Sequence, residues 1–191
     1  MRTVALTKES TKDILENLLK RSPNNYGKFE SAVDEILHKV KTEGDSALFA
    51  YTKEFDKTEI TADTIKVTEE EIKEAYEAVD PALIDVIRKA LVNIRSYHEK
   101  QRQNSWFTSE TNGTMLGQKV TALERVGVYV PGGKAVYPSS VLMNIVPAKV
   151  AGVDQIVMTT PPGKDGKVNP STLVAAKEAG ADEIYKVGGA Q

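Results

Sequence analysis

Two glycine pairs are the clearest candidates in this sequence for a ligand-binding site. Gly132-Gly133 and Gly188-Gly189 each follow a short run of β-branched residues. Glycine lets a backbone approach a ligand closely, and Ser139 or Ser140 could cap the following helix and leave N–H groups facing a cleft. Lys134 could neutralise a phosphate there. The spacing is not G-x-G-x-x-G, and a tight strand-to-helix turn explains the first pair equally well.

The other residues that could do chemistry do not form a recognisable set. His38 and His98 lie on predicted helices, each without a second His, Asp or Glu at a convincing ligand spacing. A zinc site needs three or four converging N, O or S ligands, so both histidines are predicted to be solvated helix residues. Glu69, Glu70 and Glu71 fall in a first helical turn, where they complement the helix dipole without any catalytic role.

The predicted secondary structure around the glycine pairs supports a role in ligand binding. Three β-branched runs alternate with two helix-like segments, which predicts a βαβαβ unit with a parallel sheet. The runs are Val126–Val130, Gln155–Thr160 and Ile184–Val187, and Asn169 followed by Pro170 begins the second helix. Ligands of open parallel sheets lie outside the carboxyl ends of the strands, where both glycine pairs are expected.

The first half of the chain reads as a helical scaffold. Start and stop signals predict five helices, with a short strand over Thr64–Val67. Two helices are followed by stop signals: Ser22-Pro23 ends a helix from Lys8 to Arg21, and Gly44 ends a helix through Phe29 and Val40. A third helix runs from Ala47 to Phe55. The last two helices have start signals, a capping box from Thr68 to Glu71 and Asp80-Pro81 before a long helix.

A polar linker over Gln101–Asn112 separates the two halves. We expect Trp106 and Phe107 to anchor this loop by burial. Thr114–Leu123 alternates weakly and predicts one or two strands. The resulting division is a mainly helical region over residues 1–124 with short strands, and a Rossmann-like unit over 125–191.

Composition excludes several function classes. The formal charge of −2 comes with lysine and arginine spread along the whole chain, so neither a nucleic-acid footprint nor a membrane-facing basic stripe is present. Zero cysteines exclude a disulfide framework and any thiolate site. No apolar run reaches the roughly 18 residues that span a bilayer, and no signal-peptide core opens the chain. A cytoplasmic protein is expected.

Several sequence blocks in one collinear order resemble histidinol dehydrogenase. They are EGDSALFAYTKEFDKTE, VGVYVPGG, PSSVLMNIVPAKVAGV, TTPPGKDGKVNP and VGGAQ. Any single block would be weak, because glycine pairs after strands are common, but the ordered set is specific. The resemblance covers most of the 191 residues and corresponds to the amino-terminal portion of that enzyme.

The resemblance implies a fold of incomplete Rossmann-like domains, similar to aldehyde dehydrogenases, and two NAD-dependent oxidations of L-histidinol to L-histidine in a zinc-dependent homodimer. By resemblance, Tyr129 and Gln191 match the family residues that contact NAD. The family's Glu-His acid-base pair and its zinc ligands are expected beyond Gln191, so this chain alone is predicted to be inactive. The alternative is a self-contained small nucleotide-binding or interaction module without catalysis.

Overall fold

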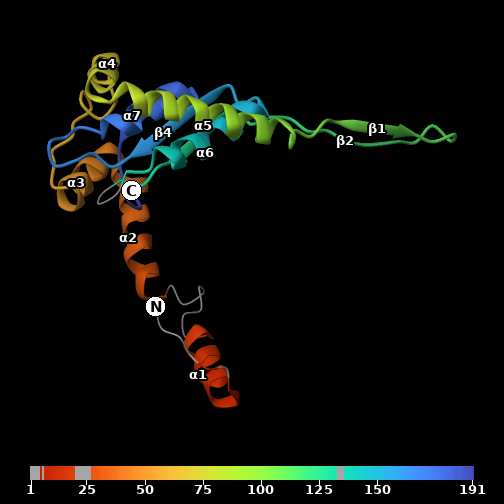
Figure 1. Cartoon of the computed structure of the whole chain (residues 1–191), viewed down its shortest axis with the longest axis horizontal. Coiled ribbons are helices and arrows are strands. Elements are labelled where there is room, and N and C mark those ends of the chain that lie inside the picture. Colours follow the sequence, from red (N-terminus) through yellow and green to blue (C-terminus); the bar gives the residue numbers. More distant parts are fainter. Residues whose placement is uncertain (1–4, 6, 20–26, 133–135) are drawn as a thin grey trace.

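The computed structural model describes residues 5, 7–19, 27–132 and 136–191. Helices of the first half surround and extend from a small α/β body, and a long ribbon projects from it (Figure 1). The helices are α1 (Lys8–Leu19), α2 (Gly27–Glu43), α3 (Asp45–Phe55), α4 (Glu69–Ala78), α5 (Pro81–Glu99), α6 (Pro138–Ala151) and α7 (Pro170–Ala179). The strands are β1 (Trp106–Ser109), β2 (Met115–Gln118), β3 (Arg125–Tyr129), β4 (Gln155–Thr160) and β5 (Glu183–Lys186).

The predicted βαβαβ unit is confirmed. Strands β3, β4 and β5 form a three-stranded parallel sheet in that order, with Gly127 opposite Val157 and Val157 opposite Glu183. Helix α6 connects β3 to β4, and α7 connects β4 to β5. Because two successive right-handed crossovers run in one direction, both helices fall on the same face of the sheet.

One face of the sheet builds the hydrophobic core. Ile156, Met158 and Ile184 are almost fully buried there with the apolar residues of α6 and α7. Helices α4 and α5 pack on α6 and α7, and their residues Ile72 and Ile87 belong to the same cluster. The core therefore crosses residue 125, and the division into 1–124 and 125–191 stays a prediction.

Most predicted helix ends are confirmed by their hydrogen bonds. Thr68 and Glu71 form the capping box of α4, the Asp80 carboxylate caps α5, and the Asn169 side chain caps α7. The prediction for α6 is wrong: the helix begins at Pro138 with Tyr137 at the N-cap position, and Ser139 and Ser140 lie within its first turn. A proline favours the first helical position, and the helix therefore begins two residues earlier than a cap at Ser139 would allow.

A hydrogen-bonded cluster around Glu178 of α7 joins three helices. Its carboxylate accepts hydrogen bonds from the Tyr76 hydroxyl of α4 at 2.8 Å and from Arg88 Nε and Nη2 of α5 at 3.1 and 2.8 Å. Burial, together with this hydrogen bond, raises the pKa of Tyr76 to about 12. The hydroxyl therefore stays protonated as a donor at any physiological pH.

Removing the Tyr76 hydroxyl is expected to weaken the contact between α4 and α7. Tyr76→Phe should lower the free energy of unfolding by about 1 kcal/mol, because the Glu178 carboxylate loses one charge-assisted partner. Tyr97→Phe is the matched control, since Tyr97 is 62% exposed. Urea unfolding measures both variants at neutral pH, and equal stabilities for the two would contradict a role of Tyr76 in this contact.

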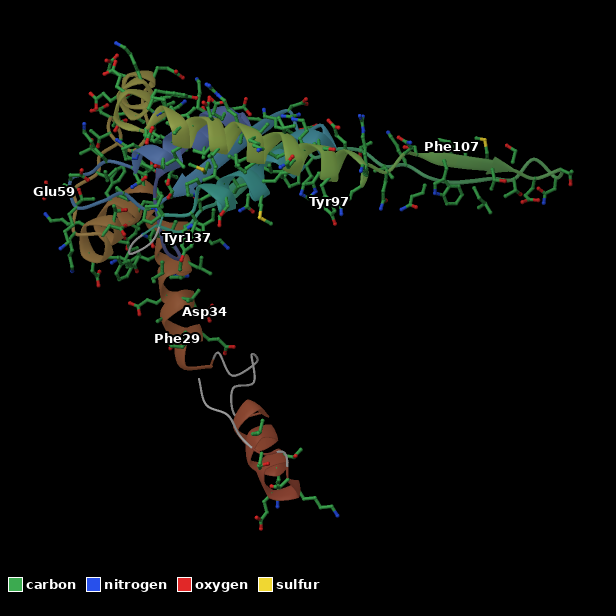
Figure 2. The ribbon with its side chains drawn as sticks, viewed as in Figure 1. Phe29, Asp34, Glu59, Tyr97, Phe107 and Tyr137 are labelled. Atoms are coloured by element: carbon green, nitrogen blue, oxygen red, sulfur yellow. The ribbon has the colours of Figure 1, made fainter. Side chains whose placement is uncertain are left out.

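The region expected to be a polar linker forms a hairpin. Strands β1 and β2 pair antiparallel, with Phe107 opposite Gly117, and the ribbon projects from the body with Phe107 on its surface (Figure 2). The prediction that Trp106 and Phe107 are buried anchors is wrong: they are 53% and 66% exposed. A two-stranded ribbon is a single layer and, among the described residues, has no second layer to bury them, although the Phe107 ring lies over Gly117.

The remaining predictions for the first half are mixed. Helix α2 ends at Glu43, and Gly44 follows with a φ of 62°, as expected of a glycine stop. The expected strand over Thr64–Val67 is reduced to an antiparallel bridge between Lys66 and Tyr185. Arg21 and Ser22-Pro23 lie outside the described residues. Within the described residues, no helix has both the length and the apolar character needed to cross a membrane.

Candidate functional site

Three loops converge at the carboxyl ends of the parallel strands. They begin after Tyr129 of β3, after Thr160 of β4 and after Lys186 of β5. The parallel arrangement brings all three to the same edge of the sheet, as the sequence predicts.

Pro161 lies where the first glycines of the two pairs meet. A Cβ built on Gly132 would be 2.6 Å from Pro161 Cγ, and one built on Gly188 would be 3.1 Å from Pro161 Cα and closer still to its Cβ. These glycines therefore allow the loops to pack on one proline ring. Gly132 and Gly188 thus lie close together, and glycine is needed at these two positions because the loops pack tightly against each other.

The second glycines differ from the first. Gly189 has a φ of 72°, a conformation that favours glycine, and a Cβ there would collide with the Gln191 side chain. Gly133 and Lys134 lie outside the described residues, so the predicted role of Lys134 at a phosphate stays a prediction.

The predicted ligand residues Tyr129 and Gln191 lie at this end of the sheet. The Tyr129 side chain, at the end of β3, is 48% exposed. The amide nitrogen and oxygen of Gln191 are both buried and have no hydrogen-bond partner among the described residues. Buried polar groups are almost always paired, so this amide fits a position that a bound ligand or further polypeptide completes.

A cavity of about 370 Å³ opens beside the β3 and β4 loops. It is lined by residues of three segments, among them Pro131, Gly132, Val136, Thr160, Pro161, Asp165, Lys167, Asn169 and Thr172. The N-terminus of α7 on its wall is already satisfied, because the Asn169 side chain accepts from the Ser171 N–H and the Asn169 carbonyl from Thr172. At α6, the Tyr137 carbonyl likewise accepts from the Ser140 and Val141 N–H groups, and the difference from α7 is only that no side chain caps the helix.

The cation nearest in sequence to the second glycine pair is already neutralised. Lys186, the last residue of β5, is 5% exposed, and its ammonium donates to Glu71 Oε1 at 2.5 Å. Glu71 Oε2 accepts from the Thr68 backbone N–H at 2.9 Å. Burial alone would raise the pKa of Glu71, but the hydrogen bonds from Lys186 and Thr68 outweigh it and lower the pKa below its usual value.

Sequence reasoning missed this ion pair. It assigned Glu71 to the capping box and the first turn of the helix, which the structure confirms, but it did not give Glu71 a second role as the partner of Lys186. The signal was the position of Lys186: it shares the buried face of β5 with Ile184, two residues earlier. A lysine on the apolar face of a strand requires a partner.

The histidines lie where the sequence placed them, on helices. His38 belongs to α2, and His98 in α5 shares a hydrogen bond of 2.7 Å between Nδ1 and Gln101 Oε1. Among the described residues, no group of three or more His, Cys, Asp or Glu side chains could hold a metal ion. At this edge of the sheet, the described residues offer the exposed Tyr129 ring and the unpartnered Gln191 amide as groups that a ligand could meet.

Comparison with known proteins agrees with the resemblance read from the sequence. Residues 19–191 match the family profile described as histidinol dehydrogenase. The histidinol dehydrogenase of Bacillus subtilis is 59% identical over 159 residues, which are 83% of this chain and 37% of the relative. That of Methanocaldococcus jannaschii is 50% identical over 185 residues, or 96% of this chain and 43% of the relative.

A solved structure has the same fold. The crystal structure of histidinol dehydrogenase from Elizabethkingia anophelis superposes with a TM-score of 0.79 at 37% identity, covering 85% of this chain and 37% of that one. The chain thus spans about two fifths of the length of the relatives it matches, which agrees with the prediction that it corresponds to one portion of the enzyme. The chain belongs to the histidinol dehydrogenase family.

Proposed function

We propose that this chain supplies one wall of the NAD site in an enzyme that oxidises L-histidinol to L-histidine. The observation that carries the proposal is the convergence of Gly132 and Gly188 on Pro161, which groups Tyr129 and Gln191 at one end of the sheet. Family membership supports an oxidoreductase, and the unpartnered Gln191 amide supports a polar ligand at this place.

The residues present fit NAD in part. The exposed Tyr129 ring would orient one end of the dinucleotide, and the Gln191 amide would pair with its polar groups. When bound, NAD accepts the hydride of each oxidation step. The described residues do not fit zinc, so no step of the reaction is assigned to a metal on this chain.

The other properties of the proposed enzyme follow from the family. We infer a cytoplasmic homodimer whose acid-base pair and zinc ligands come from polypeptide corresponding to the part of the relatives that this chain does not span. The alternative of a small module without catalysis is less well supported, since the matched relatives carry the name of one enzyme.

The chain alone is expected not to reduce NAD with histidinol and zinc. Adding the part of the Bacillus subtilis relative that follows the matched region should produce NADH, measured by its absorbance. In that complex, Tyr129→Ala should raise KM for NAD about tenfold with a smaller change in kcat, because it removes a binding contact. Tyr97→Ala is the control at an exposed tyrosine of α5.

Two results would contradict this assignment. Turnover by the purified 191-residue chain alone would show that the reactive groups lie within it. An active complex in which Tyr129→Ala leaves KM for NAD unchanged would show that this strand end does not bind the cofactor.

A further inference from the structure

The turn at the tip of the β1–β2 ribbon holds an asparagine followed by a glycine. Asn112 is the only asparagine of the sequence that precedes glycine. Both residues are exposed, as is every residue from Gln101 to Arg125. The ribbon projects from the body of the molecule, and this turn lies at its far end (Figure 1). Water therefore reaches the Asn112 carboxamide and the peptide bond that follows it.

The hydrogen bonds of the hairpin explain why glycine follows Asn112. The Gly113 N–H donates to the Glu110 carbonyl at 3.1 Å, and the Glu110 N–H donates to the Thr114 carbonyl at 2.8 Å. Gly113 has a φ of 83°, so the loop is a β-turn closed by one left-handed residue, a common hairpin connection. A residue with a Cβ rarely adopts that conformation. The fold therefore favours glycine directly after the asparagine.

The Asn112 side chain turns back onto the chain. Its Oδ1 accepts a hydrogen bond from the Thr114 N–H at 2.9 Å, as asparagine side chains in turns commonly do with the residue two positions ahead. The carboxamide is thus held beside the backbone that follows it and is not directed away into water. The Thr114 N–H also points at the oxygen that becomes negative when a nucleophile adds to the carboxamide carbon. A donor already fixed at that oxygen lowers the barrier to addition.

We propose that Asn112 is a site of spontaneous deamidation, in which the Gly113 backbone nitrogen attacks the carboxamide carbon of Asn112. The nitrogen gives up its proton to hydroxide as the new C–N bond closes a five-membered succinimide ring. The carboxamide nitrogen takes up a proton and leaves as ammonia. One water molecule then opens the ring at either of its two carbonyls, which yields aspartate or isoaspartate at this position.

The turn contains features that act on the rate in opposite directions. Glycine carries no Cβ, so nothing on Gly113 hinders the approach of its nitrogen, and the Thr114 N–H favours addition. The hydrogen bond from the Gly113 N–H to the Glu110 carbonyl opposes it, because that bond must open first. A two-stranded hairpin is only marginally stable, and loop tips open at little cost in free energy. The reaction is therefore expected in the folded chain.

Isoaspartate would change the tip of the ribbon more than aspartate. In isoaspartate the main chain runs through the former side-chain carbons, which adds one main-chain atom between Glu110 and Gly113. The two hydrogen bonds that close the loop depend on its length, so both are expected to be lost. Either product replaces a neutral amide with a carboxylate and changes the formal charge of the chain from −2 to −3.

Prolonged incubation of the 191-residue chain in neutral buffer tests the proposal. Isoaspartate should accumulate at Asn112 at least about tenfold faster than at Asn104, which is also exposed but precedes a serine whose Cβ hinders the attack. Peptide mapping by fragmentation mass spectrometry locates the modified residue. Methylation by an isoaspartate-specific methyltransferase quantifies the product.

Two matched variants and one change of conditions separate the causes. Asn112→Gln lengthens the side chain by one methylene, so attack would have to close a six-membered ring, and the isoaspartate signal should disappear. Asn104→Gln should leave the signal unchanged. In the folded chain, the rate at Asn112 should lie within about tenfold of the rate in urea, because opening of a loop tip costs little free energy.

Three outcomes would overturn the proposal. An Asn112 that changes no faster than Asn104 would show that the following glycine confers no reactivity in this turn. Aspartate without isoaspartate would show direct hydrolysis of the side chain with no cyclic intermediate. A folded chain that reacts more than about tenfold slower than the chain in urea would show that the turn protects Asn112.

Discussion

Glu71→Ala is expected to destabilise the chain by about 3 kcal/mol, because it leaves the buried Lys186 ammonium without a partner. Lys186 is 5% exposed, and Glu71 is the acceptor of its hydrogen bond. This value lies at the lower end of the destabilisation expected when one partner of a buried ion pair is removed, since the Glu71 carboxylate keeps some contact with water. The same substitution removes the capping interaction with the Thr68 N–H.

Glu70→Ala provides the matched control in the same helical turn. Glu70 is exposed, and its one ion pair among the described residues is with Lys73 at 3.6 Å, so its loss should cost no more than about 0.5 kcal/mol. Urea unfolding at neutral pH measures both variants. The double variant Glu71→Ala, Lys186→Met should recover much of the loss, because no unpaired charge remains buried. A double variant as unstable as Glu71→Ala would contradict the account.

The pH dependence of this pair has a definite sign. The folded pKa of Glu71 lies below its ordinary value of 4.5. A carboxyl with a depressed folded pKa contributes stability that is present above the unfolded pKa and is lost as the pH falls through the folded one. The difference in stability between the wild type and Glu71→Gln should therefore shrink below pH 4.5.

Gly188→Ala is expected to lower the free energy of unfolding by about 1–3 kcal/mol through overpacking. The added Cβ would meet Pro161 Cα at 3.1 Å and Cγ at 3.0 Å, and Cα belongs to the backbone, which cannot turn aside. Gly188 is also buried. The loops after β4 and β5 must separate to admit the methyl group.

Gly127→Ala is the control for this substitution. Its Cβ meets nothing within 4 Å, and Gly127 lies on an exposed strand position, so the chain should be as stable as the wild type or slightly more so. Thermal unfolding compares the two alanine variants. Equal midpoints for Gly188→Ala and Gly127→Ala would show that the loops do not pack as closely as described.

The sequence predicts the α/β unit well because its signals are local. β-Branched runs, the capping box at Thr68 and the N-caps at Asp80 and Asn169 each specify a structure within a few residues. Failures arose where tertiary context decides. Trp106 and Phe107 were expected to be buried because they are large and apolar, but the hairpin that carries them contacts no second layer among the described residues.

The binding roles of Tyr129 and Gln191 stay predictions, whereas the edge of the sheet that they share is confirmed. Strand order places both glycine pairs at one edge, but their spacing cannot reveal that Gly132 and Gly188 meet at Pro161, 29 and 27 residues away in sequence. The partnership of Glu71 with Lys186 joins residues 115 apart. Contacts of that range depend on the packing of α4 against α7, which no local pattern encodes.

Titration of the 15N-labelled chain with NAD tests most directly whether this end of the sheet is one wall of a nucleotide cleft. At millimolar NAD, the amide signals of Tyr129, Val130 and Gly132 and those of Gly188–Gln191 should shift together, and Tyr129→Ala should weaken that response. Shifts confined to another surface, such as the β1–β2 ribbon, or an unchanged set of signals at these two loops, would contradict the account.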